Sequence, residues 1–183
     1  MEKISTRIYS VGVNDHDKDL FEGLWPIPFG VSYNSYLILD EKVALIDTVE
    51  YGFEEEYLAN IEKVLDGRKI DYLVVNHMEP DHSSLVAYML RKHPELMVVA
   101  NAKTVPMLKG YYETPEEKIK VVAEGESISL GSCNLNFYMI PMVHWPETMV
   151  TWLECENTVF SGDAFGTFGT VTGSIVDEPG TLQ

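Results

Sequence analysis

The feature that most constrains the fold of this chain is a series of short apolar runs rich in β-branched residues. The first three runs cover residues 7–12, 34–40 and 42–48, and each has the length and composition of a β-strand. Asp40 and Glu41 lie between the second and third runs like the turn of a hairpin. The sequence therefore predicts that the chain opens with antiparallel strands.

The middle of the chain alternates between helical and strand patterns. An amphipathic helix is predicted in the segment that Gly67 closes, because apolar side chains recur there at helical spacing. A buried strand at 71–76 follows. Ser83 or Ser84 is then expected to cap a second helix that runs to Arg91.

The remainder of the chain is predicted to be mainly strand. A buried strand at 96–100 precedes a helix at about 104–112. Turns then separate five further strands, expected at 118–123, 126–131, 134–140, 148–154 and 158–162. This order predicts two sheets with helices packed outside them.

Composition excludes several classes of function. The chain has 183 residues, of which 45% are apolar, so it is long enough to bury the core of one domain. Its formal net charge of -16 repels nucleic acid and anionic lipid. No apolar run has the length of a signal peptide core or of a membrane span, and we expect a cytoplasmic protein without nucleic-acid or membrane partners.

The chain contains two cysteines, Cys133 and Cys155. Both lie in apolar, strand-like segments, and their spacing is not that of a CxxC motif. Free cysteines of this kind are commonly buried in the core. We therefore expect two buried thiols.

The stretch "NHMEPDHSS" (76–84) places His77, Glu79, Asp81 and His82 directly after a buried strand. Residues two apart in an extended segment point the same way, so the first three are expected to share a side, with His82 offset. This geometry favours two adjacent metal ions over one. His77 with Glu79 would serve the first, and Asp81 with His82 the second.

Two further candidate ligands follow later strands. His144 lies in "PMVHWPET" and Asp163 in "SGDAFG", each just past a predicted strand end, where sites are commonly assembled. Taken singly, a histidine such as His144 is more often a surface or core residue than a ligand, and Asp163 is more often a turn residue. Imidazole and carboxylate ligands without cysteine favour iron or manganese over zinc.

The order HxExDH, a histidine in "HWPET" and the later "GDAFGTFG" resembles the flavodiiron proteins (A-type flavoproteins). The stretch "GVSYNSYLILDEKVALIDT" is also similar to that family, whose N-terminal domain has the metallo-β-lactamase fold. Hydrolases of this superfamily typically have a histidine where this chain has Glu79. Asp47 matches a position that supports the metal loop from behind.

The resemblance implies an α+β domain with a metallo-β-lactamase-like αββα sandwich. It also implies a ligand set for two irons: His77, Glu79 and His144 for the first, Asp81 and His82 for the second, and Asp163 as the bridge. The family reduces dioxygen to water or nitric oxide to nitrous oxide with electrons from FMN. A rubredoxin-like or flavin-reductase electron donor is implied as well.

The sequence departs from the family pattern after Asp163. The second iron of the family takes another histidine there, and neither that histidine nor the flavodoxin-like FMN domain is present in residues 1–183. We expect these residues to be the N-terminal portion of the diiron domain, with an uncovered sheet face that favours a homodimer. A fragment is favoured over a split enzyme or a degenerate homologue. A dinuclear-metal hydrolase and a truncated, inactive metal-binding domain are the alternative functions.

Overall fold

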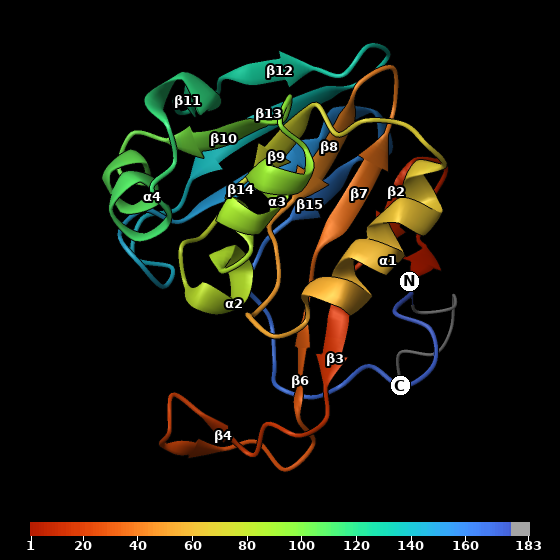
Figure 1. The fold of residues 1–183 in the computed structure, drawn as a ribbon, viewed down its shortest axis with the longest axis vertical. Helices are drawn as coiled ribbons and strands as arrows, with labels where there is room; N and C mark the ends of the chain where they lie inside the picture. The colour runs from red at the N-terminus through yellow and green to blue at the C-terminus, as the bar shows by residue number, and fades with distance from the viewer. Residues whose placement is uncertain (177–183) are drawn as a thin grey trace.

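Two β-sheets pack face to face, and helices cover the outer face of the larger sheet (Figure 1). The structure is a computed structural model that describes residues 1–176. Two short ribbons of paired strands lie at one end of the molecule, outside the main sheets. The two predicted sheets with helices outside them are confirmed.

The larger sheet has seven strands and mixes antiparallel with parallel pairing. Its first four strands are neighbours in antiparallel pairs, and its last four pair in parallel. The predicted opening hairpin is confirmed as β7 and β8. In sheet order the strands are β1 (Glu2–Lys3), β2 (Ile8–Ser10), β7 (Tyr36–Leu39), β8 (Val43–Ile46), β9 (Tyr72–Val74), β10 (Met97–Asn101) and β11 (Ile119–Val122).

The smaller sheet has four antiparallel strands, all of which the sequence predicted. They are β12 (Ser127–Ser129), β13 (Asn134–Met139), β14 (Met149–Leu153) and β15 (Thr158–Phe160). The two small ribbons were not predicted, because strands of two or three residues carry no periodic pattern. They pair β3 (Val13–Asp15) with β6 (Val31–Tyr33), and β4 (Leu20–Phe21) with β5 (Trp25–Pro26).

Helical segments connect the parallel strands of the larger sheet. The first is the predicted amphipathic helix, which ends where Asp66 and Gly67 adopt positive φ angles. In chain order these segments are α1 (Glu54–Leu65), α2 (Pro80–Ser83), α3 (Val86–Lys92), α4 (Val105–Tyr112) and the 3-10 turn η1 (Glu116–Lys118). A second 3-10 turn, η2 (Glu154–Glu156), lies between β14 and β15 of the smaller sheet.

The predicted helix cap at Ser83 or Ser84 is wrong. A helical turn begins earlier, at Pro80, because the fixed φ of proline suits the first helical position. The Ser83 hydroxyl instead donates hydrogen bonds to the carbonyl oxygens of Met78 and Glu79. The second half of the HxExDH motif therefore lies on a helix and not on an extended loop.

The central strands of the larger sheet bury both of their faces. In β8, Leu45 belongs to the core beneath the helices, whereas Ala44 and Ile46 belong to the core between the two sheets. In β9 the same alternation separates Leu73 from Val74. Near-continuous apolar runs are typical of strands that are covered on both sides.

The prediction of two buried thiols is wrong. Cys133 and Cys155 form a disulfide with their Cα atoms 5.5 Å apart. Cys133 is buried just before β13, but Cys155 lies on the exposed turn η2. The pair links β13 to the turn between β14 and β15, a contact that sequence spacing does not report.

Among residues 1–176 no helix is long and apolar enough to cross a membrane.

Substitutions of Phe137 and Tyr138 test which face of β13 is buried between the two sheets. Phe137 is fully buried between the sheets, and Tyr138 faces outward with 37% exposure. We expect Phe137→Ala to lower the free energy of unfolding by about 3–5 kcal/mol. The matched change Tyr138→Ala is expected to cost below about 1 kcal/mol. Urea unfolding measures both, and equal losses would contradict this packing.

Candidate dinuclear metal centre

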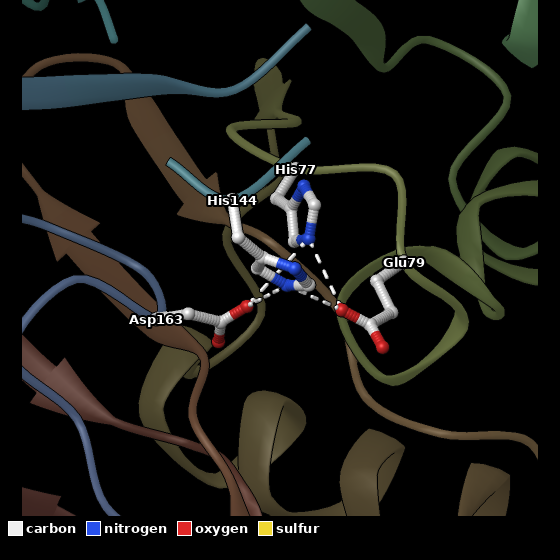
Figure 2. Close-up of side chains that lie close together, drawn as sticks. All are labelled: His77, Glu79, His144 and Asp163. Atoms are coloured by element: carbon white, nitrogen blue, oxygen red, sulfur yellow. Dashed lines mark hydrogen bonds and ion pairs between the residues drawn. The ribbon is translucent and has the colours of Figure 1, made fainter. Parts of the chain in front are cut away.

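The predicted ligands lie where strands of both sheets end at one edge of the sandwich. The loop and turn after β9 carry the HxExDH residues, the loop between β13 and β14 carries His144, and the turn after β15 carries Asp163. Figure 2 shows three of these segments directing side chains toward one point. Residues far apart in the sequence are thus brought together by the layered fold.

Four of the six predicted ligands form one cluster (Figure 2). His77, Glu79, His144 and Asp163 each offer a ligand atom, and these atoms all lie within 4.8 Å of one another. Oε2 of Glu79 is 2.8 Å from Nε2 of His144 and 3.3 Å from Nε2 of His77. The predicted grouping of these two histidines with Glu79 agrees with this geometry.

The carboxylate of Asp163 faces two groups of side chains. Its Oδ2 lies 3.2 Å from Nε2 of His144 and 3.6 Å from Nε2 of His77. Its Oδ1 lies 2.7 Å from Nε2 of His82. One oxygen is therefore directed toward each of the two predicted metal sets.

Asp81 lies apart from the four-residue cluster. An extended segment after β9 would place Asp81 on the same side as His77 and Glu79. This prediction is wrong, because Asp81 belongs to the helical turn α2. Its Oδ2 is 3.8 Å from Nε2 of His82 instead. The helical turn separates Asp81 and His82 from the first pair, which preserves the division into two sets.

Asn76 holds the ligand loop to both sheets. Its backbone N–H donates to Oδ1 of Asp47 at 2.7 Å, and its carbonyl accepts from the N–H of Met149 at 3.0 Å. The Thr151 hydroxyl donates to its side-chain oxygen at 2.7 Å. Asp47 is buried behind the loop with a φ of 54°. Asp47 thus stabilises the loop through the backbone of Asn76.

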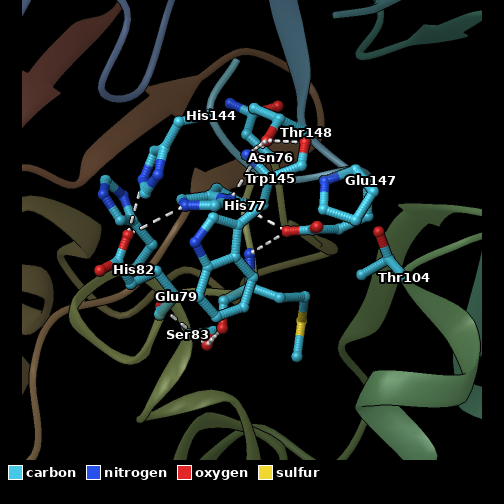
Figure 3. A network of polar contacts seen from close by, with 12 residues as sticks. Asn76, His77, Glu79, His82, Ser83, Thr104, His144, Trp145, Glu147 and Thr148 are labelled. Carbon is cyan, nitrogen blue, oxygen red and sulfur yellow. Dashed lines mark hydrogen bonds and ion pairs between the residues drawn. The ribbon is translucent and has the colours of Figure 1, made fainter. Parts of the chain in front are cut away.

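Glu147 is the side chain of this site that sequence reasoning missed. It is 1% exposed, and its Oε1 lies 2.9 Å from Nδ1 of His77 (Figure 3). The same oxygen accepts the backbone N–H of Met78 at 3.0 Å. The ring of Trp145 packs edge-on against His77, with centroids 5.2 Å apart. The only sequence signal for Glu147 is an acidic residue three positions after His144.

The carboxylates of the site favour the protonated, positively charged form of its buried histidines. Burial alone would lower the pKa of His77, but hydrogen bonds to Glu147 and Glu79 raise it to about 9. Burial likewise opposes the charge of His82, whereas Asp163 and other carboxylates raise its pKa to about 9. Burial raises the pKa of Asp47 to about 6. In the metal-free protein, protons on the histidines thus compensate the buried carboxylates.

The four-residue cluster fits one divalent transition-metal ion, and Asp81 and His82 beside Asp163 are candidate ligands for a second. Oδ1 of Asp81, a buried atom of the second set, has no hydrogen-bond partner among the described residues. A buried polar atom without a partner costs free energy, which an ion or a proton relay would recover. The donor set is nitrogen and oxygen without thiolate, which suits iron or manganese.

The ligands open into a cavity of about 510 Å³. Glu79, Asp81, His82, His144 and Asp163 line one part of it. Apolar side chains such as Ile8, Phe21 and Phe160 line much of the rest, together with polar ones such as Ser32 and Asn34. A small, weakly polar molecule can therefore reach the ligands through an apolar space.

Comparison with known proteins gives consistent similarities. A family profile described as ODP family beta lactamase matches residues 31–178. The chain is 36% identical over 165 residues to the anaerobic nitric oxide reductase flavorubredoxin of Vibrio vulnificus strain YJ016. It superposes on the flavodiiron protein of Giardia intestinalis with a TM-score of 0.89 and 31% identity. Rubredoxin oxygen:oxidoreductase of Desulfovibrio gigas gives a TM-score of 0.88 and 33% identity.

The similarities cover most of this chain but a smaller part of each relative. The Vibrio alignment spans 89% of the chain and 33% of the relative. The two structures cover 94% and 93% of the chain, which corresponds to 42% of each. The predicted metallo-β-lactamase-like fold and the resemblance to flavodiiron proteins are confirmed. Of the αββα layers, residues 1–176 supply one helical layer and both sheets.

Substitutions of Asp163 and His144 are expected to change the metal content of the protein in different ways. Asp163→Asn is expected to weaken both metal positions, because its carboxylate faces both sets of ligands. His144→Ala is expected to weaken one position and leave the other. Elemental analysis of anaerobically loaded protein measures both, with His93→Ala as a control outside the site. Loss of only one metal in Asp163→Asn would contradict a bridging role.

Proposed function

Because the chain belongs to the ODP family of beta lactamases, we propose that it forms the diiron site of a reductase for dioxygen or nitric oxide. The observation that carries this proposal is the position of Glu79, whose carboxylate lies between the imidazoles of His77 and His144. A carboxylate at this position favours iron, where a third histidine would favour zinc. The names of the relatives, a nitric oxide reductase and an oxygen oxidoreductase, support the reaction class.

Each predicted ligand has a role in this proposal. His77, Glu79 and His144 hold the first iron, and Asp81 and His82 hold the second. Asp163 would be the ligand shared by both irons, because one of its carboxylate oxygens faces each set of ligands. Iron bound by these residues would supply electrons for the reduction of dioxygen or nitric oxide.

The proposed reactions consume electrons that must come from outside the site. Dioxygen takes up four electrons and four protons to give two waters. Two molecules of nitric oxide take up two electrons and two protons to give nitrous oxide and water. FMN is the proposed immediate donor, with a rubredoxin-like protein or a flavin reductase supplying it. A cytoplasmic homodimer is the proposed state of the protein.

The surroundings of the site suit this reaction. The apolar walls of the cavity admit small neutral molecules such as dioxygen and nitric oxide. His144 is 52% exposed at the rim, whereas His77 is buried beneath Trp145. Solvent therefore reaches the cluster from one side. Hydrolysis is not favoured as an alternative, because the relatives are named as reductases and Glu79 replaces the histidine typical of the hydrolases.

Metal content and gas consumption test the proposal together. The protein is prepared without oxygen, loaded with ferrous iron and supplied with reduced FMN in solution. We expect two irons per chain and consumption of dioxygen or nitric oxide in excess of the free-flavin control. Stoichiometric zinc in the protein as isolated, with ester or thioester cleavage, would instead identify a hydrolase.

Glu79→His probes the choice of metal directly. The change replaces a carboxylate that favours iron with an imidazole, so we expect preference to shift toward zinc and reductase activity to disappear. Glu79→Gln is the matched control, because it removes the charge without adding a nitrogen ligand of the imidazole type. Competition between zinc and ferrous iron measures the shift. An unchanged preference in Glu79→His would remove the basis for assigning iron.

A further inference from the structure

Glu147 is a buried acid whose position the metal ligands alone do not explain. It does not belong to the cluster of candidate ligands, yet it is 1% exposed and lies directly behind that cluster. Burying a carboxylate costs several kcal/mol unless hydrogen bonds compensate it. Here the N–H of Met78 and the imidazole of His77 compensate Oε1, whereas Oε2 has no hydrogen-bond partner among the described residues.

The two nitrogens of His77 face different surroundings. Nε2 faces the cluster, 3.3 Å from Glu79 and 3.6 Å from Asp163. Nδ1 faces away from it, 2.9 Å from Oε1 of Glu147. An ionised carboxylate only accepts hydrogen bonds, so this contact requires a proton on Nδ1. The lone pair of a neutral His77 is then on Nε2, directed into the cluster.

We propose that Glu147 is a positioning residue that fixes the tautomer and the ring orientation of His77 for the first metal ion. This inference rests on the proposed metal centre. A carboxylate on the non-ligating nitrogen of a histidine also raises the basicity of the ligating nitrogen. Glu147 therefore makes His77 both better oriented and a stronger ligand.

Glu147 also joins the segments that carry the ligands. It follows His144 by three residues on the loop between β13 and β14, and its side chain reaches the loop after β9. Its backbone carbonyl accepts a hydrogen bond from Nδ2 of Asn101, at the end of β10, at 2.5 Å. Figure 3 shows this network behind His77. Glu147 thus connects the ends of three strands next to the ligands of the first metal ion.

Among the described residues, no carboxylate holds His82 of the second metal ion in the way that Glu147 holds His77. Nδ1 of His82 has no hydrogen-bond partner among residues 1–176, and its nearest carboxylate oxygen, on Asp47, is 4.0 Å away. Asp47 instead accepts the backbone N–H of Asn76. Removing Glu147 should therefore weaken the first metal position and spare the second. A general loss of stability would affect both.

The test compares three variants by titrating Co²⁺ or Fe²⁺ against a chromophoric chelator under anaerobic conditions. Glu147→Ala removes the acceptor, and we expect one binding phase to weaken by about 10- to 100-fold while the other is unchanged. Glu147→Gln keeps an oxygen that accepts from His77 and should bind between wild type and alanine. Glu117→Ala, an exposed glutamate on η1, is the matched control and should behave as wild type.

Thermal unfolding of the metal-free and metal-loaded forms separates positioning from a structural role. We expect the stabilisation by metal to shrink in Glu147→Ala, whereas Glu147→Gln restores most of it. Equal weakening of both phases, or wild-type binding in Glu147→Ala, would overturn the inference. If the alanine variant does not fold, Glu147→Met fills the same volume without an acceptor and takes its place under the same criteria.

The outcomes also distinguish this inference from the proposed function. A wild-type chain that binds fewer than two metals contradicts the dinuclear site itself, whatever Glu147 does. A wild-type chain that binds two metals, together with a Glu147→Ala variant that binds both equally well, contradicts only the role of Glu147.

Discussion

The concentration of buried carboxylates beside histidines is the constraint on which this structure depends. Glu79, Glu147 and Asp47 are almost fully buried, and each accepts hydrogen bonds or faces an imidazole. Negative charge at this density is stable only when cations or protons balance it. Without metal the histidines supply protons, and with metal they supply lone pairs. The same side chains thus explain the raised histidine pKa values and provide donor atoms suited to a divalent ion.

The fold creates this concentration by ending strands of both sheets at one edge. The parallel strands β8, β9 and β10 deliver Asp47, the ligand loop and Asn101, and the antiparallel strands deliver His144 and Asp163. Asn76 then links the two sheets through Met149 and Thr151. The cores on either side of the larger sheet hold these strand ends in register. The site is therefore a product of the layers and not of the HxExDH loop alone.

The strands and the candidate ligands were predictable because both follow local patterns. Apolar runs marked every strand of the two sheets except β1, and ligand-type residues stood directly after strand ends. Contacts between distant segments were not predictable from local sequence. Pro80 began a helix earlier than the serines suggested, and this placed Asp81 away from Glu79. The Cys133–Cys155 disulfide and the burial of Glu147 likewise depend on how separate strands meet.

Anomalous X-ray diffraction at the iron absorption edge distinguishes two bound irons from one and from zinc. Crystals of anaerobically iron-loaded protein are measured just above and just below the edge. The account predicts two peaks of anomalous density on opposite sides of the Asp163 carboxylate, one beside Glu79 and one beside His82. A single peak, or peaks that persist below the iron edge and rise at the zinc edge, would contradict a diiron centre.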